Sequence, residues 1–280
     1  MSRREEILAR LAQKRREGRA IIGAGAGTGI SAKFLHRGGA DLIFIYNSGR
    51  FRMQGLSSWV GHLPFGDANA IVMEMGEREV MPVVPEAAVI AGVCGIDPTR
   101  RMSHFLPKIV EAGFAGVINY PTVAVIDGRM RADLEAGNLG FDREVEMIAI
   151  AHRLDLLTTA YVCTADEATA MVEAGVDMIV AHMGLTVGGS IGAQHAMDMQ
   201  NAADGVTRIA EASRRARADV FVVAHGGPIA GPADAERLFA MTAVDGFVGA
   251  SSMERLPIEE PLRANTAAFA ALRVRPAGAP

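Results

Sequence analysis

A unit of strand, histidine, glycine turn and helix occurs twice in this sequence, and the repeat constrains the fold more than any other feature. One apolar run ends at His182 and is followed by Gly184, and a second ends at His225 before a pair of glycines. A glycine-rich loop and a helical stretch at about 194–217 separate the two runs. This spacing is typical of consecutive βα units. In a parallel α/β fold, the carboxyl ends of the strands meet where ligands bind.

Eight apolar, β-branched runs alternate with helical periodicity along the 280 residues. Besides the runs that end at the two histidines, they lie at about 20–22, 42–46, 89–94, 115–120, 156–162 and 246–251. This count, in a chain of this length, favours an α/β fold of the (β/α)8 TIM-barrel type. A doubly wound sheet is the alternative, but it usually has fewer strands. No linker divides the chain, so we expect one domain over residues 1–280, with a helix at 1–18 outside the barrel.

Charge and cysteine content exclude several classes of protein. The formal net charge of −4 gives no electrostatic reason to expect nucleic acid or an anionic membrane as a partner. The N-terminal segment is dense in charges of both signs, unlike a signal peptide or a membrane span. Two cysteines, Cys94 and Cys163, are too few for a disulfide framework or a zinc site of their own. We therefore expect a cytoplasmic protein.

Polar side chains stand at most of the expected strand ends, whereas the strand bodies are apolar. His182 and His225 are the best candidates for catalysis, because imidazole exchanges protons near neutral pH. Asn47, Asn119 and Tyr161 stand at other strand ends and are expected to contact substrate oxygens. The alternative is that each of these side chains only satisfies loop backbone. The pattern predicts a basin for a small polar substrate.

A second set of residues is expected to bind an anion. In TIM barrels the loops after strands seven and eight often hold phosphate, because glycine lets backbone N–H groups approach it. The same glycines could simply form tight turns. The expected anion-binding residues are Gly25, Thr28, Arg50, Gly226, Gly227, Gly249, Ser251 and Ser252.

The glycine-rich loop at 25–30 does not match the dinucleotide fingerprint. Ile30 stands where G-x-G-x-x-G needs its last glycine, and no acidic residue ends the second strand. We therefore expect no NAD. Two long connections, at 47–66 and 121–140, are candidates for lids over the site.

A metal site is left open by the sequence. Glu86, Asp97, Asp127 and Glu254 lie in connections between strands and helices and could reach inward. Each alone could equally be a cap or a surface group. Mg²⁺ held mainly by water and substrate would leave almost no spacing signature, so it remains possible.

Five segments of the chain resemble the signature segments of the TIM-barrel phosphoenolpyruvate hydrolase-like family. They are Tyr46–Arg50, Gly66–Ala70, Gly92–Pro98, Gly184–Gly189 and Gly249–Arg255. The same module resembles the C-terminal half of certain plant virus-resistance proteins. The resemblance implies a barrel of the phosphoenolpyruvate/pyruvate superfamily with phosphonopyruvate-hydrolase-like activity. Well-studied members of that superfamily carry paired aspartates for Mg²⁺ after strand three, where this chain has Cys94-Gly95-Ile96-Asp97.

The leading interpretation is an enzyme that hydrolyses, or cleaves a C–C or C–P bond in, a small anionic oxoacid or its phosphonate relative. A barrel that binds a ligand or partner without turnover, as a sensor or scaffold, is the alternative. Non-haem iron oxygenation is a third. We also expect a homo-oligomer, because apolar side chains recur in the expected outer helices. They are Ile71, Val72, Met73, Met75, Phe239, Met241, Phe269 and Leu272.

Overall fold

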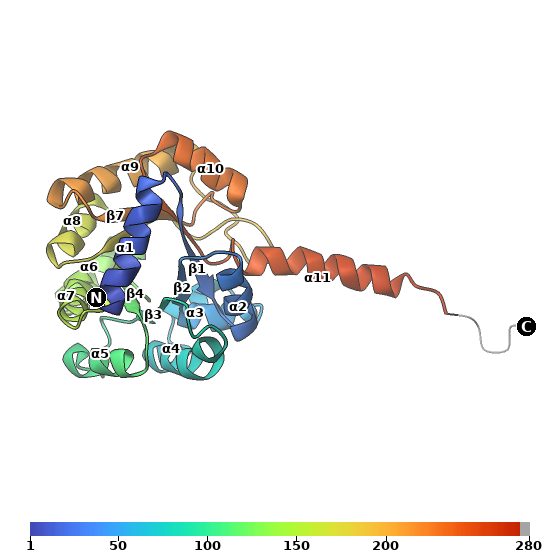
Figure 1. Ribbon diagram of the computed structural model, residues 1–280, viewed down its shortest axis with the longest axis horizontal. Helices are drawn as coiled ribbons and strands as arrows, with labels where there is room; N and C mark the ends of the chain where they lie inside the picture. Colours follow the sequence, from blue (N-terminus) through green and yellow to red (C-terminus); the bar gives the residue numbers. More distant parts are fainter. Residues whose placement is uncertain (275–280) are drawn as a thin grey trace, which may run out of the picture.

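Eight parallel strands close into a barrel in chain order, as expected from the eight apolar runs. The computed structural model describes residues 1–274, and in it each strand is hydrogen-bonded to the next and β8 to β1 (Figure 1). The strands are β1 (Ile21–Ala26), β2 (Leu42–Ile45), β3 (Val89–Val93), β4 (Gly116–Asn119), β5 (Leu157–Val162), β6 (Met178–His182), β7 (Phe221–His225) and β8 (Gly246–Gly249). The predicted (β/α)8 fold is confirmed.

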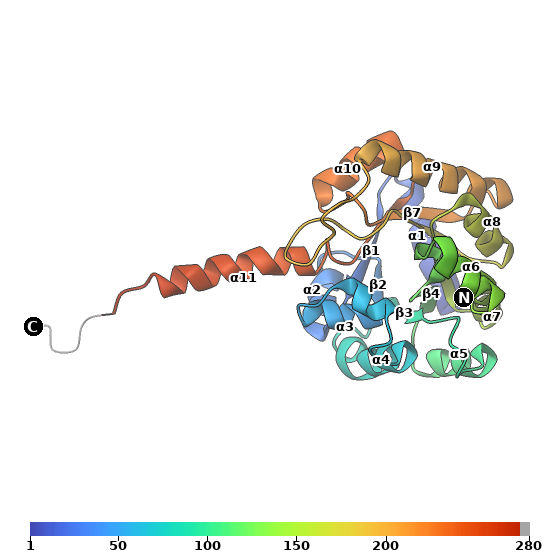
Figure 2. The same ribbon diagram turned by 180° about the vertical axis from the view of Figure 1, so that it is seen from behind.

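Helices surround the strands, and one helix projects away from the barrel (Figure 2). The α-helices are α1 (Arg3–Arg16), α2 (Gly29–Arg37), α3 (Asn47–Met53), α4 (Ala68–Met75), α5 (Met102–Glu111), α6 (Gly128–Ala136), α7 (Phe141–Arg153), α8 (Ala165–Glu173), α9 (Met199–Ala216), α10 (Pro232–Met241) and α11 (Arg255–Ala270). Short helical turns are η1 (Ser58–His62), η2 (Gly76–Val80), η3 (Met81–Val83) and η4 (Val123–Val125). Within residues 1–274, no helix combines the length and apolarity needed to cross a membrane.

Side chains alternate between the inside of the barrel and the layer under the helices. On β2, Phe44 belongs to the inner cluster, while Ile43 and Ile45 belong to the outer one. Gly23 on β1 lies beside Phe44, and a Cβ atom there would come within 2.6 Å of the Phe44 ring. Glycine at this position therefore makes room for a large ring inside the barrel.

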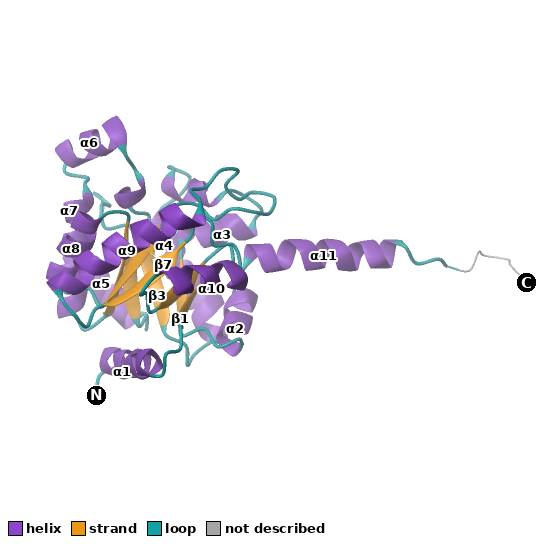
Figure 3. Ribbon diagram, turned by 90° about the horizontal axis from the view of Figure 1, so that it is seen from above, coloured by secondary structure: helices purple, strands orange, loops and turns teal. Residues whose placement is uncertain are grey.

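Helix α1 closes the amino end of the barrel, where the sequence predicts a helix outside the strands (Figure 3). Ile7 and Leu11 are buried and join the inner cluster with Ile21 and Leu42. Ser2 caps the helix, since its side chain accepts the Glu5 N–H. The ligand-binding end of the barrel is thus the opposite one.

Three aspartates tie α1 to the barrel by the same arrangement. Each stands just before a strand and accepts a backbone N–H from a neighbouring strand or its start. Each also accepts a hydrogen bond from a basic side chain of α1, in the pairs Arg4–Asp177, Lys14–Asp41 and Arg15–Asp245. These charges are largely buried, so the contacts fix the direction of α1 across the barrel end.

Several expected boundaries were wrong, each for a local reason. The glycines at 23–26 lie within β1 rather than in a turn, because the inner rings need the space that glycine leaves. Helix α5 does not follow β3 directly but begins at Met102, because Asp97 caps a turn by accepting the Thr99 N–H. The helix expected at 194–217 begins at Met199, where Asp198 accepts the Asn201 N–H.

The two long connections are not irregular loops. Segment 47–66 contains α3 and η1, and segment 121–140 contains η4 and α6. The closing helix, α11, starts at Arg255. Both long segments stand at the carboxyl end of the barrel, where they bring further side chains to the site described below.

Candidate active site

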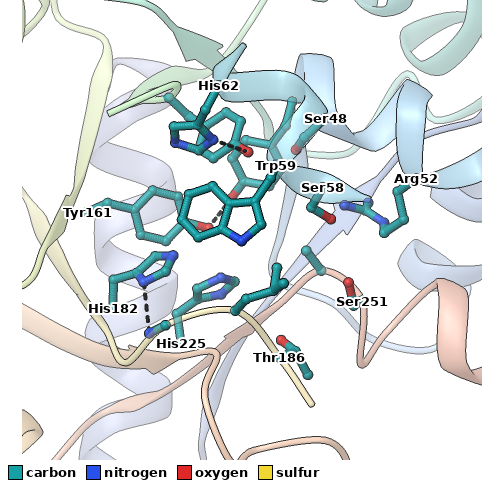
Figure 4. A pocket seen from close by; sticks show the side chains of 15 residues that line it. Ser48, Arg52, Ser58, Trp59, His62, Tyr161, His182, Thr186, His225 and Ser251 are labelled. Carbon is teal, nitrogen blue, oxygen red and sulfur yellow. Dashed lines mark hydrogen bonds between the residues drawn. The ribbon is translucent and has the colours of Figure 1, made fainter. Parts of the chain in front are cut away.

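A small cavity opens at the carboxyl end of the strands (Figure 4). Its volume is about 50 Å³, measured as the space open to the centres of water molecules. One water needs roughly 10–15 Å³ by this measure, so the cavity fits a ligand of a few heavy atoms. The lining residues are Tyr46, Ser48, Arg52, Ser58, Trp59, His62, Tyr120, Tyr161, His182, Gly184, Leu185, Thr186, His225, Ala250 and Ser251.

The two strand-end histidines lie side by side in this cavity. His182 and His225 are register partners on β6 and β7, and their ring centroids are 4.8 Å apart. Nδ1 of His182 accepts the Gly184 N–H at 3.1 Å, which leaves the proton of the neutral ring on Nε2. Nδ1 of His225 lies 2.7 Å from the Val248 carbonyl oxygen, so Nδ1 carries the proton and Nε2 is a free acceptor. The neutral pair therefore offers one donor and one acceptor.

Burial keeps the imidazoles of the cavity neutral. Desolvation lowers the pKa of His225 to about 4, with the hydrogen bond to Val248 acting in the opposite direction and the positive charge of Arg52 in the same direction. The pKa of His182 lies well below its ordinary value, because of desolvation and then the neighbouring His225. His62, which is also buried, has a pKa lowered to about 4 by desolvation. At neutral pH each ring is thus uncharged and acts as a hydrogen-bond partner, and Nε2 of His225 is the free nitrogen of the pair that can accept a proton.

All three tyrosines of the chain meet beneath the histidines. The hydroxyls of Tyr46 and Tyr161 are 2.8 Å apart, and the Tyr120 ring lies 4.8 Å from the Tyr46 ring. Tyr161 also contacts both histidines, with ring centroids 5.1 Å from His182 and 4.9 Å from His225. Desolvation raises the pKa of Tyr120 to about 12, so its hydroxyl stays protonated. The tyrosines form a rigid, neutral floor.

Segment 47–66 supplies the opposite wall. The only tryptophan of the chain, Trp59, packs against His62 with ring centroids 5.0 Å apart. Nδ1 of His62 lies 3.3 Å from the Tyr120 hydroxyl, while its Nε2 is buried without a partner among residues 1–274. These side chains enclose the cavity, so the segment expected to be a lid does line the site.

Arg52 is the cationic side chain of the cavity. Its Nε and Nη2 donate to Glu254 Oε2 at 3.1 and 2.6 Å, and both side chains are almost fully buried. Glu254 Oε1 accepts the Gly27 N–H at 2.7 Å. A buried pair with this geometry places a guanidinium at a fixed position in the cavity wall.

The structure places Asn119 and Asn47 outside the cavity. On β4, Ile118 and Tyr120 point inward, so Asn119 points outward, where it donates to Glu144 at 2.5 Å. Asn47 starts α3, and its side chain donates to the Gly61 carbonyl at 2.9 Å. The two-residue period of the strand turns Asn119 away from the ligand space, whereas Asn47 belongs to α3 and bonds to the backbone of η1.

The structure also places Arg50 away from the expected anion site. Its guanidinium binds Glu74 and Glu79 at 2.8 and 2.6 Å on the outside of α3. Two residues along the same short helix, Arg52 turns inward instead. The helix thus presents Arg52, and not the predicted Arg50, to the cavity.

The expected glycine and hydroxyl donors divide into two groups. Ser251 lines the cavity, whereas Thr28 caps α2 by accepting the Ser31 N–H. The Gly227 N–H donates to the Gly184 carbonyl, and a Cβ atom on Gly226 would lie 2.1 Å from the same oxygen. These two glycines therefore let neighbouring loops approach each other. The remaining three do not line the cavity either: Gly25, Gly249 and Ser252.

The carboxylates proposed as metal ligands lie too far apart in the structure to bind one metal ion together. Glu86 precedes β3, so it stands at the wrong end of the barrel. Asp97 is bound by Asn69, Thr99 and Arg100, and Asp127 is exposed at the start of α6. Within residues 1–274, no group of three His, Cys, Asp or Glu side chains is arranged to hold a metal.

The side chains of the cavity itself differ from the ligands that Mg²⁺ prefers. This ion prefers octahedral oxygen ligands that include one or two carboxylates. The cavity lining contains hydroxyls and imidazoles but no carboxylate, and Glu254 behind it is already bound by Arg52 and Gly27. The residues present do not fit a magnesium site.

Sequence reasoning missed several cavity residues. They are Tyr46, Ser48, Arg52, Ser58, Trp59, His62, Tyr120 and Thr186. The two tyrosines could have been found from the period of the strands. Tyr46 follows the inward-facing Phe44 by two residues, and Tyr120 follows the inward-facing Ile118 by two, so both also point inward. The rarity of tryptophan and tyrosine in this chain was a second signal.

Comparison with known proteins places the chain among related sequences. The sequence profile of the family described as "Phosphoenolpyruvate hydrolase-like" matches residues 6–272. The ToMV resistance protein Tm-1(GCR237) of Solanum lycopersicum is 55% identical over 265 residues, which cover 94% of this chain and 35% of the tomato protein. The chain thus spans about a third of the length of that relative.

Solved structures share the fold at low sequence identity. Phosphonopyruvate hydrolase in complex with oxalate and Mg²⁺ gives a TM-score of 0.63 at 16% identity, over 100% of this chain and 92% of the other. A 2,3-dimethylmalate lyase, titled a member of the PEP mutase/isocitrate lyase superfamily, gives 0.62 at 13% identity, over 100% and 93%. These two structures therefore share the barrel fold of this chain.

Proposed function

Because the chain belongs to the phosphoenolpyruvate hydrolase-like family, we propose that it is an enzyme acting on a small anionic 2-oxoacid or its phosphonate relative. The reaction is hydrolysis or cleavage of a C–C or C–P bond through an enolate. The observation that carries this proposal is the pair of neutral histidines, one donor and one acceptor, in one small cavity. A cytoplasmic location belongs to the same proposal.

The two histidines have different roles in this reaction. Water loses a proton to Nε2 of His225 as its oxygen bonds to the electrophilic carbon or phosphorus. The electron pair of the breaking bond moves onto the oxoacid fragment as an enolate, whose oxygen accepts a hydrogen bond from Nε2–H of His182. The His225 imidazolium then returns the proton to the enolate carbon. The buried tyrosines and Trp59 keep bulk water away.

The names of the structural neighbours guide the choice of substrates and probes. One neighbour is named for phosphonopyruvate and holds oxalate, and another is named for a dimethylmalate. Oxaloacetate and phosphonopyruvate are therefore the substrates to try first, with oxalate as an enolate-like probe.

Turnover of both acids by the purified protein at pH 7.5 tests the proposal. His225→Gln and His182→Gln preserve much of the side-chain size but remove the proton acceptor and the ring donor, and should each lower turnover by ~100-fold or more. His104→Gln, an exposed histidine on α5, is the matched control and should leave turnover unchanged. Equal rates in all four proteins would refute the assigned roles.

A barrel that binds without turnover is the second candidate, and the name of the tomato relative, a virus-resistance protein, favours keeping it. Calorimetric titration of the same acids separates the two functions. Binding without any product supports the binding barrel. Absence of both binding and product rejects the cavity as a site for this class of ligand.

A further inference from the structure

The guanidinium of Arg52 combines almost complete burial with an unused donor. Its side chain is only 1% exposed, and Nε and Nη2 are bound to Glu254. The remaining nitrogen, Nη1, has no hydrogen-bond partner among residues 1–274. It is not completely buried, and Arg52 lines the cavity. In Figure 4 the guanidinium points toward Ser58 and the interior of the cavity. Nη1 is thus positioned to donate to a ligand.

Glu254 holds Arg52 in this position and is itself fully occupied. Its Oε2 accepts both Arg52 bonds, and its Oε1 accepts the Gly27 N–H at 2.7 Å. Glu254 is 0% exposed at its side chain, so it cannot turn toward the cavity without losing three hydrogen bonds. Freeing it to ligate a metal would leave a buried guanidinium without its counter-charge, which is strongly destabilising.

A divalent cation in the same cavity would also meet a fixed positive charge. Like charges a few ångströms apart repel strongly where water is excluded. The other lining side chains are neutral: hydroxyls, aromatic rings and imidazoles with lowered pKa values. The cavity therefore favours an anion next to Arg52 over a metal ion.

We propose that Arg52, fixed by Glu254, is the cation that binds the substrate's carboxylate or developing enolate oxygen, in the role that a divalent metal ion would otherwise fill. This inference rests on the proposed function and assigns its substrate as a carboxylate that binds without a metal. Arg52 is a binding residue, and Glu254 is a positioning residue that acts through it. Charge-assisted hydrogen bonds of this kind contribute enough to govern affinity for a small acid.

Oxalate binding to the wild-type protein tests the proposal without any variant. Trp59 is the only tryptophan and lines the cavity, so its fluorescence reports binding at this site. Oxalate should bind with the same Kd in EDTA and in excess Mg²⁺. Binding that appears only with Mg²⁺, or that becomes tenfold tighter with it, would overturn the proposal while leaving the proposed function standing.

Three variants then locate the cation. Arg52→Lys keeps the positive charge but loses the planar guanidinium group with its several N–H donors. It should weaken oxalate binding roughly 10- to 100-fold. Arg52→Met combined with Glu254→Met removes the pair together, so no buried charge is left alone and the fold should be retained. This double variant should lose oxalate binding. Arg50→Gln, whose arginine faces outward on the same helix, is the matched control and should bind as wild type does.

The outcomes separate this proposal from the proposed function. A folded double variant that binds oxalate as tightly as wild type would show that Arg52 is not the anchor. Loss of oxalate binding in Arg50→Gln but not in Arg52→Lys would show that the anchor is Arg50, the arginine predicted from the sequence, and not Arg52. If wild type turns over oxoacids but needs Mg²⁺ to do so, only the inference about Arg52 fails.

Discussion

At the scale of single residues, identical side chains acquire different chemistry from their backbone partners. His182 and His225 end equivalent strands, yet one ring accepts an N–H from Gly184 and the other donates to the Val248 carbonyl. A sequence shows two histidines but not the backbone atoms that select the tautomer of each ring. The same limit explains the choice of Arg50 over Arg52, since both occur in one turn of α3.

The buried histidines make stability depend on pH. Their folded pKa values are lowered from about 6.5, so they stabilise the fold above that pH, and this contribution is lost as pH falls toward 4. His225 alone should cost about 2 kcal/mol of unfolding free energy between pH 7.5 and pH 5, because the unfolded chain takes up the proton first. Urea unfolding at the two pH values measures this.

A glutamine variant provides the control for that dependence. His225→Gln should flatten the change in unfolding free energy between the two pH values, whereas His104→Gln should leave it as in wild type. An equally steep change in His225→Gln would mean that other groups cause it.

At the scale of elements, strand period and helix direction determine which predictions succeed. The strands themselves were predictable, because runs such as 42–46 are continuously apolar. Asn119 points away from the cavity because it lies between the inward-facing Ile118 and Tyr120. Segment 47–66 could be recognised as a candidate lid by its length, but its helical turns depend on contacts such as Asn47 to Gly61.

Helix α1 should stabilise the barrel without affecting the site. Leu11 is fully buried in the inner cluster at the amino end, far along the strands from the cavity. Leu11→Ala should lower the unfolding free energy by about 2–5 kcal/mol, since it removes buried methyl groups and leaves a void. Chemical denaturation measures the change. Gln13→Ala, on the exposed side of the same helix, should change it by less than about 0.5 kcal/mol.

Turnover by the folded Leu11→Ala protein should remain close to wild type. A cost below about 1 kcal/mol, or a selective loss of turnover in the folded protein, would contradict this view of α1.

At the scale of the whole molecule, the barrel was predictable and the course of its last helix was not. Helix α11 projects from the barrel in Figures 1 and 3, and every residue from Pro261 to Val274 is exposed. Of the apolar residues expected on the outer surface, Val72 and Met75 are buried, whereas Phe269 and Leu272 are 66% and 70% exposed. Sequence periodicity cannot show whether an apolar stripe packs on its own barrel.

Assembly with a second copy of the chain remains a proposal, and α11 gives it a defined form. Ile258, Leu262, Phe269 and Leu272 follow one face at coiled-coil spacing. The face begins in a groove that Ile30, Phe34 and Leu35 of α2 line, with Ile258 and Leu262 opposite them. An isolated helix of this length is marginally stable in water. We expect the partner's α11 to fill this groove in a two-fold arrangement.

Light scattering with size-exclusion chromatography tests this assembly. Wild type should run as a dimer or larger, and Leu262→Glu combined with Phe269→Glu should dissociate it, because each buried side chain stabilises the contact by about 1.5–3 kcal/mol. Ala264→Glu combined with Ala271→Glu adds the same charge to the opposite face and should keep the assembly. A monomeric wild type at about 50 μM would contradict the proposal.

The central claim is that two neutral histidines with opposite tautomers receive a small acid in this cavity, and ¹⁵N NMR of the imidazole nitrogens tests it most directly. At pH 7 the spectrum should show His182 protonated on Nε2 and His225 on Nδ1, with assignments from the glutamine variants. Addition of oxalate should shift both Nε2 signals and leave that of exposed His104 in place. Two identical tautomers, or Nε2 signals that no oxoacid moves, would contradict the account.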